Sequence, residues 1–243
     1  MFEGRTFKGV PPSPKADDDR LRSRMKKATF ALSRLLGLLL LTSTASVRAE
    51  DASLIVVLDR DGVAVSRLAE ARNGMNTFRA IMVVDATVSE ILAVLSDWES
   101  RPEWMSRCVE SRVLERHADG VVVSYQRNRG VWPVSDRDAV VAVSHRASAD
   151  GSDVRIDMNN TTSELMPPVD GVVRVPLVES FYHLVAEGPR QTRVTYQVIA
   201  DLGGSIPGFI ARRATENLPF DTMRNLRGFV RETRLGNVAG GGD

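Results

Sequence analysis

The chain has 243 residues, of which 43% are hydrophobic and 6% aromatic, and Cys108 is its only cysteine. This composition is typical of a globular protein, and a single cysteine excludes both an intramolecular disulfide and a site built from several cysteines. Residues 1–49 carry ten Lys or Arg and four Asp or Glu, whereas residues 50–243 carry 22 and 27, so the body is acidic and we expect no nucleic-acid partner.

The N-terminal part of the chain has the pattern of an export signal. After Met25 come two lysines, an apolar run from Leu35 to Leu41 and small residues that end at Ala49. This pattern predicts a signal peptide over residues 25–49, cleaved near Ala49, and a periplasmic or secreted protein. An uncleaved anchor is the alternative, although the apolar run is shorter than the roughly 20 residues of a spanning helix. Residues 1–24 are polar and proline-rich, and we expect a disordered extension or a segment that precedes the true start at Met25.

Residues 50–243 are predicted to form one domain with a core over residues 62–235. Segments 62–68 and 76–84 have strand-like apolar patterns and form a hairpin around Asn73-Gly74. Thr87 and Glu90 have the spacing of a capping box, which begins a short amphipathic helix that ends at Trp98. Further strands are predicted at 108–115, 120–127, 138–147, 154–159, 171–175, 180–186 and 193–200. A long helix over residues 205–234, kinked at Pro219, completes an α+β order in which a curved antiparallel sheet wraps around the C-terminal helix.

Four segments of this body stand out in chain order. They are Trp132-Pro133-Val134-Ser135-Asp136-Arg137-Asp138, Pro167-Pro168-Val169-Asp170-Gly171-Val172-Val173-Arg174-Val175, Thr192-Arg193-Val194-Thr195-Tyr196 and Asp201-Leu202-Gly203-Gly204-Ser205-Ile206-Pro207-Gly208-Phe209. They resemble, in the same order, the motifs of the START domain, the lipid-transfer module related to steroidogenic acute regulatory protein. Val172, Leu202 and Phe209 depart from the residues usual in that family. The chain is therefore similar to an exported bacterial member of the family.

The resemblance implies a helix-grip fold with an internal apolar cavity between the sheet and the terminal helix. It implies binding, and transport or sensing, of a lipid or other hydrophobic small molecule, with transient membrane contact, no cofactor and no catalysis. The cavity would be entered beneath the terminal helix and the loop from Thr161 to Pro168. Two alternatives stay open: a cyclase or hydrolase-like enzyme of the same fold group, and a module that delivers lipid or quinone to a membrane complex.

The candidate ligand-binding residues combine side chains that suit an apolar cavity. They are Tyr125, Arg137, Met158, Met166, Tyr196, Ile206, Ile210, Ala214 and Met223. Tyrosine hydroxyls orient a polar group, methionine adapts to flexible hydrocarbon, and the last four residues form the inner stripe of the terminal helix. Arg137 and Asp138 are neighbours on a strand, so only one of them faces the cavity. We favour a structural role for the pair over ligand contact.

Catalytic and metal sites find little support in the sequence. His117, His145 and His183 lie far apart and have no metal-ligand spacing, and no nucleophile elbow or phosphate loop is present. Some members of the family hold the polar end of the ligand with a buried ion pair. Residues 139–143 after Asp138 carry no charge, so the strand offers no such anchor.

Overall fold

The computed structural model describes residues 54–69, 75–204 and 208–240, and it leaves the side chains of residues 208–216 and 235–240 undescribed. Ten strands form a single sheet, in the order β1-β2-β3-β10-β9-β7-β6-β5-β4, with β8 paired to β6. The strands are β1 (Leu54–Arg60), β2 (Val63–Leu68), β3 (Thr77–Val84), β4 (Cys108–Arg116), β5 (Val122–Asn128), β6 (Arg137–Ala147), β7 (Asp153–Asn160), β8 (Val173–Arg174), β9 (Leu177–Gly188) and β10 (Gln191–Asp201). The helices are α3 (Val88–Ser96), α4 (Arg101–Trp104) and α5 (Gly208–Gly240).

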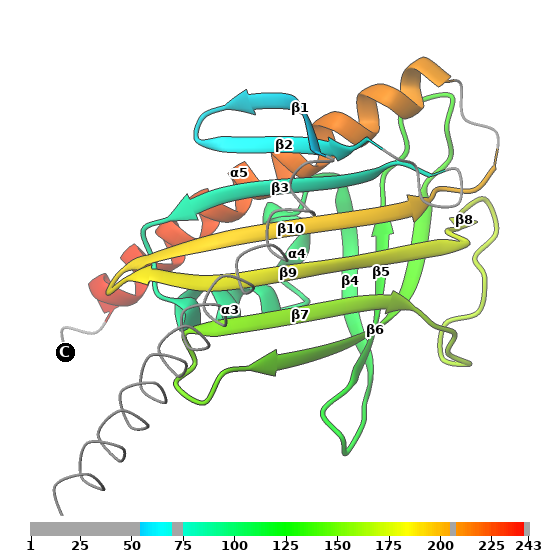
Figure 1. Ribbon diagram of the computed structural model, residues 1–243. Coiled ribbons are helices and arrows are strands. Elements are labelled where there is room, and N and C mark those ends of the chain that lie inside the picture. Colours follow the sequence, from blue (N-terminus) through cyan, green and yellow to red (C-terminus); the bar gives the residue numbers. More distant parts are fainter. Residues whose placement is uncertain (1–53, 70–74, 205–207, 241–243) are drawn as a thin grey trace, which may run out of the picture. The chain divides into compact units, whose positions relative to one another are not determined.

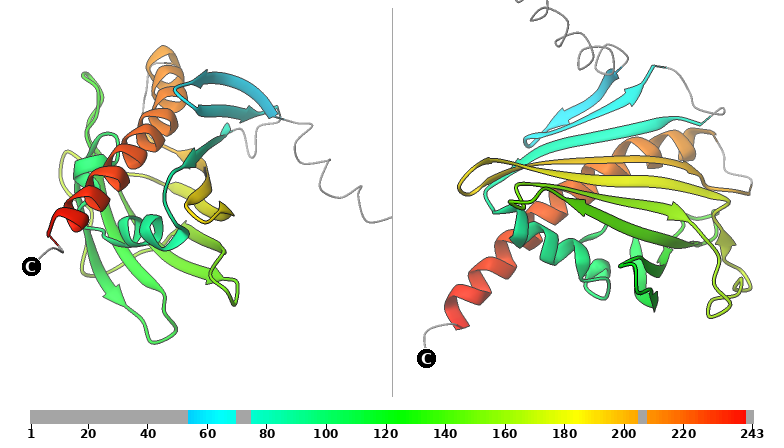
Figure 2. Two further views of the ribbon diagram at one scale, coloured as in Figure 1. Left: turned by 90° about the vertical axis from the view of Figure 1, so that its left-hand side faces the viewer. Right: turned by 60° about the horizontal axis from the view of Figure 1, so that its bottom comes forward.

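The sheet curves around the long terminal helix. In Figure 1, β4 and β5 run across the direction of β9 and β10, and α5 lies along the inner face. Figure 2 shows α5 held between the β1–β2 hairpin on one side and α3 and α4 on another. Phe220, Met223, Leu226 and Val230 of α5 are buried against this face. Every strand pairing is antiparallel except that of β8 with β6, which confirms the predicted α+β helix-grip fold.

The short helix α3 begins where the sequence predicts. The Thr87 hydroxyl accepts a hydrogen bond from the backbone N–H of Glu90 at 3.2 Å, and the Glu90 carboxylate accepts one from the N–H of Thr87 at 2.8 Å. Both bonds of a capping box are therefore present. The hydrogen bond from the Thr87 backbone N–H is the chief cause that lowers the pKa of the Glu90 carboxyl.

Several element boundaries differ from those predicted. Strand β1 was not predicted, although Asp61-Gly62 is a common hairpin turn and both residues have the positive φ that such a turn requires. Helix α4 follows α3 as a separate turn around Pro102. Helix α5 extends to Gly240, beyond the predicted end at residue 234. The predicted turn at Asn73-Gly74 and the leader lie outside the described residues.

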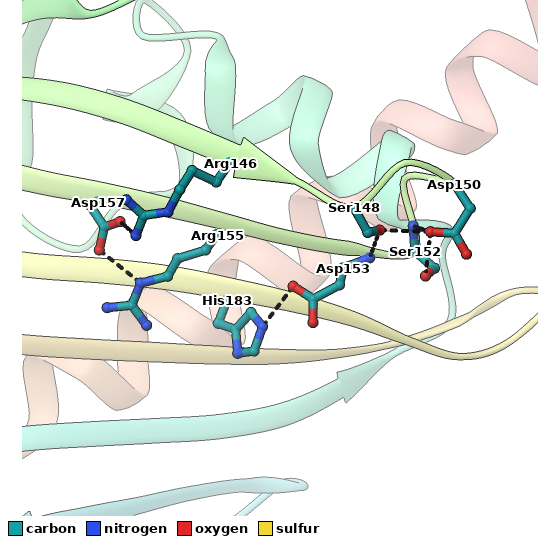
Figure 3. Close-up of polar contacts among 8 residues, drawn as sticks. All are labelled: Arg146, Ser148, Asp150, Ser152, Asp153, Arg155, Asp157 and His183. Carbon is teal, nitrogen blue, oxygen red and sulfur yellow. Dashed lines mark hydrogen bonds and ion pairs between the residues drawn. The ribbon is translucent and has the colours of Figure 1, made fainter.

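The outer face of β6, β7 and β9 is polar. Asp157 on β7 pairs with Arg146 at 2.7 Å and with Arg155 at 2.9 Å, and Asp153 meets His183 at 3.0 Å (Figure 3). These residues alternate along the strands with inward-facing apolar ones, as expected for a sheet with one solvated face. Within the described ranges, no helix is long and apolar enough to cross a membrane, and no group of His, Cys, Asp or Glu is placed to hold a metal ion.

Candidate functional site

A cavity of about 230 Å³ lies on the inner face of the sheet. Its apolar wall comes from β6, β7, β9 and β10, through Ala139, Val141, Met158, Val178 and Val198. Its polar wall comes from α4 and β5, through Arg101, Gln126 and Asn128. Leu218, Pro219 and Thr222 of α5 close it on the remaining side. The helix and the curved sheet together therefore enclose an amphipathic space.

Three of the predicted site residues line this cavity. They are Arg137, Met158 and Tyr196. Met223 is fully buried among core side chains and does not belong to the lining, whereas Pro219, one turn earlier on the same helix face, does. Ile206 and the side chains of Ile210 and Ala214 lie outside the described residues. The expected role of the early part of α5 therefore stays a prediction.

Tyr125 and Met166 lie on the opposite face of the sheet, away from the cavity. They form a second buried cluster with Val123 and Val140. Side chains alternate between faces along a strand, and the inward positions of β5 are taken by Gln126 and Asn128. Because Met166 belongs to the segment from Thr161 to Pro168, that loop covers the outer face, and our expectation that it gates the cavity is corrected.

The loop beside the cavity is instead the one between β5 and β6. Arg129, Gly130, Val131 and Val134 all contribute to the lining. The loop folds tightly on itself, because a Cβ added at Gly130 would lie 2.0 Å from the backbone oxygen of Val134. Only glycine fits at this position without displacing the loop.

Arg137 and Asp138 point to opposite faces, as predicted for neighbours on a strand. Arg137 donates to the backbone oxygen of Ser135 and, at 3.4 Å, to that of Gly203. It thereby joins the loop after β5 to the segment that precedes α5. Asp138 accepts two hydrogen bonds from Arg174, at 2.7 and 3.1 Å, on the other face. Arg137 and Asp138 therefore make separate contacts on opposite faces of the sheet, and Arg137 is the one that reaches the cavity.

Arg101 is the most unusual residue of the lining, and sequence reasoning missed it. It is 2% exposed, and no carboxylate among the described residues forms an ion pair with it. Its guanidinium stacks 3.5 Å from the ring centroid of Trp98 and donates to the backbone oxygen of Leu95 at 3.2 Å. Its Nε has no hydrogen-bond partner. Its position, three residues from both Trp98 and Trp104, was the available sequence signal.

Two tyrosines lie near this cation on the sheet. The rings of Tyr182 and Tyr196 stack with centroids 4.6 Å apart. Burial raises the pKa of Tyr196 to about 12 and that of Tyr182 well above its usual value, while it lowers the pKa of Arg101. Both phenols are therefore neutral hydrogen-bond donors near neutral pH, and the hydroxyl of Tyr182 has no partner.

Comparison with known proteins finds relatives that are similar over most of the chain. An uncharacterized protein of Pseudomonas aeruginosa is 31% identical over 169 residues, which is 70% of this chain and 82% of that one. The phosphatidylcholine transfer protein of Bos taurus is 26% identical over 165 residues, or 67% and 76% of the two chains.

Solved structures agree with this grouping. A fragment of the STAR-related lipid transfer protein from Xanthomonas axonopodis has a TM-score of 0.66 at 27% identity, covering 74% of this chain and 99% of that one. Human STARD10 has a TM-score of 0.69 at 22% identity, with 77% of each chain covered, and supports the fold alone. The START domain family model matches residues 57–235. Because this match spans most of the sequence, the chain belongs to the START domain family.

Proposed function

We propose that this protein binds one lipid or other hydrophobic small molecule in its cavity and carries or senses it. The observation that carries the proposal is the pairing of an apolar wall with Arg101, a buried cation that has no carboxylate partner among the described residues. An amphipathic ligand satisfies both features at once. Relatives named as lipid transfer proteins support the same function.

Burial of hydrocarbon is a sufficient source of affinity. Each methylene removed from water contributes about 0.8 kcal/mol, so an acyl chain binds strongly without covalent chemistry. Met158 on the apolar wall suits such a ligand, because its unbranched thioether side chain adapts to chains of different shape.

The composition of the lining favours a carrier over an enzyme. Among the described residues, the lining includes no Asp, Glu, His or Cys. General acid–base catalysis needs a group whose pKa lies near the working pH, and burial raises the pKa of Tyr196 to about 12. We therefore propose that the protein is not an enzyme.

Transient contact with a membrane is part of this proposal. Trp132 is 90% exposed and Val131 is 38% exposed, and both belong to the loop between β5 and β6. Val131 also lines the cavity. An exposed tryptophan favours the membrane–water interface, where its ring is half buried among headgroups. Contact at this loop would place the cavity next to the lipids that it exchanges.

Native mass spectrometry of the protein purified from its own host tests the proposal. We expect one co-purifying apolar molecule per chain, lost after extraction with organic solvent. A second assay measures transfer of that molecule between donor and acceptor vesicles. An empty protein that binds no apolar probe would contradict the carrier function, and turnover of an added molecule would favour an enzyme of the same fold group.

A further inference from the structure

We propose that the ligand is a single-chain amphiphile with an anionic end and no cationic group. A free fatty acid and a single-chain phosphate ester share this chemistry. The inference rests on the proposed function and narrows its ligand class, which differs from the zwitterionic, two-chain phospholipid named for the bovine relative.

The first argument is the charge of the lining. Its described residues include four arginines, Arg101, Arg107, Arg129 and Arg137, and no acidic residue. Arg101 and Arg137 are 2% and 8% exposed, and the Nε of each is buried without a hydrogen-bond partner. A buried cation without a counter-ion is costly, and an anion in the cavity removes that cost.

Arginines on the outer face of the sheet do have carboxylate partners. On the outer face, Arg146 and Arg155 both pair with Asp157 (Figure 3). Residues 50–243 contain 27 acidic residues against 22 basic ones, so carboxylates are in excess. None of these carboxylates belongs to the described lining, which therefore carries a net positive charge.

The second argument concerns a cationic headgroup. A quaternary ammonium group binds best against open aromatic faces. Near Arg101, one face of Trp98 is covered by the guanidinium at 3.5 Å, and Tyr196 is stacked on Tyr182. The guanidinium of Arg101 also carries a charge of the same sign as a choline group. A choline group would therefore meet repulsion where a carboxylate meets attraction.

The third argument is size. The cavity measures about 230 Å³, whereas pockets that enclose drug-sized ligands measure roughly 300–1,000 Å³. A phospholipid with two long acyl chains is larger than such ligands. A single chain matches the available space better, with its anionic end at Arg101 and its hydrocarbon along Val141 and Met158.

The test uses the full chain and a pair of fluorescent probes. cis-Parinaric acid is a single-chain carboxylate, and its methyl ester has the same hydrocarbon without the charge. We expect the acid to bind at least about tenfold more tightly, the factor that corresponds to one charge-assisted hydrogen bond. Lysophosphatidic acid should displace it, while dioleoylphosphatidylcholine vesicles should compete much more weakly.

A variant pair assigns the preference to the cavity. Arg101→Met should lower the acid-to-ester affinity ratio, because it removes the most buried cation of the lining and keeps an apolar side chain of similar length. Arg146→Met, on the exposed outer face, should keep the wild-type ratio. If Arg101→Met does not fold, the ratio measured for the wild type still decides the question.

The outcomes separate this inference from the proposed function. Equal binding of acid and ester by the wild type would overturn the charge argument. Full displacement of the acid by one equivalent of dioleoylphosphatidylcholine would overturn the size argument. In both cases the protein remains a lipid carrier, whereas failure of every apolar probe to bind would overturn the carrier function itself.

Discussion

At the scale of single residues, Arg101 favours ligand binding but lowers the stability of the ligand-free protein. Its guanidinium is buried against Trp98, and its hydrogen-bond partners in the described part of the chain are two neutral oxygens, those of Leu95 and Gln126. A residue kept for stability alone would have a carboxylate partner or an apolar side chain at this depth. Arg101 therefore lowers the stability of the ligand-free protein, and we expect a bound ligand to offset that cost.

Replacing Arg101 should stabilise the ligand-free protein. We expect Arg101→Met to raise the free energy of unfolding by about 1 kcal/mol or more, because an apolar side chain of similar size avoids burial of an unpaired charge. Thermal denaturation of delipidated protein measures the change. A decrease would show that the stacking on Trp98 and the bond to Leu95 outweigh the cost of the buried charge.

Replacing Arg137, in contrast, should lower the stability of the protein. Arg137 donates to the backbone oxygens of Ser135 and Gly203, so Arg137→Leu leaves both without a charged donor. We expect a loss of roughly 1.5–3 kcal/mol of stability. Chemical denaturation would measure it, and an unchanged unfolding midpoint with lost ligand binding would assign Arg137 to ligand contact instead.

At the scale of elements, the loop between β5 and β6 depends on Gly130. A Cβ at this position would overlap the backbone of Val134 and Ser135, so Gly130→Ala must displace the loop. We expect a loss of stability of about 1–3 kcal/mol, as for other substitutions that force backbone shifts, and slower uptake of ligand. Denaturation and stopped-flow binding provide the measurements.

Gly228 provides the matched control. It lies in α5, and a Cβ added there would meet no atom within 4 Å. Gly228→Ala should raise stability by up to about 1 kcal/mol, because alanine favours a helix interior over glycine. Equal effects of the two substitutions would contradict the role given to Gly130.

The elements also show which features the sequence could predict. The capping box at Thr87, the strand periods and the long terminal helix follow local rules, and the structure confirms them. Strand β5 departs from the usual rule that apolar side chains face inward. Its inward positions Gln126 and Asn128 are polar. Val123 and Tyr125 face outward and pack with Met166. A shift of one residue exchanges the faces of a strand, so the usual assumption that apolar side chains face inward misplaced Tyr125.

The spacing of Arg101 from Trp98 and Trp104 was a sequence signal, but it could not show that Arg101 is buried. Arginine is mostly exposed in proteins, so its burial depends on contacts formed only after folding. Gln126 lies 25 residues further along the chain, and its side-chain oxygen accepts from Nη1 of Arg101 at 3.4 Å. The family motifs predicted the fold and the cavity, but the charge of the lining required the tertiary structure.

At the scale of the whole molecule, export is a prediction that stands on the sequence alone. The basic residues after Met25, the apolar run from Leu35 to Leu41 and Ala49 lead us to propose a mature periplasmic or secreted chain that begins close to Glu50. Cell fractionation followed by N-terminal sequencing measures this. Recovery of a cytoplasmic protein with Met1 or Met25 intact would contradict it.

The unpaired guanidinium in the cavity has a consequence for the lifetime of the protein. A ligand that binds only the folded chain adds stability that grows with its concentration, by about 2.7 kcal/mol at one hundred times the dissociation constant. The empty protein lacks this contribution and still holds an uncompensated charge at Arg101. Proteases that cut transiently unfolded chains would therefore remove empty copies first. The amount of this protein in the cell would then follow the supply of its ligand.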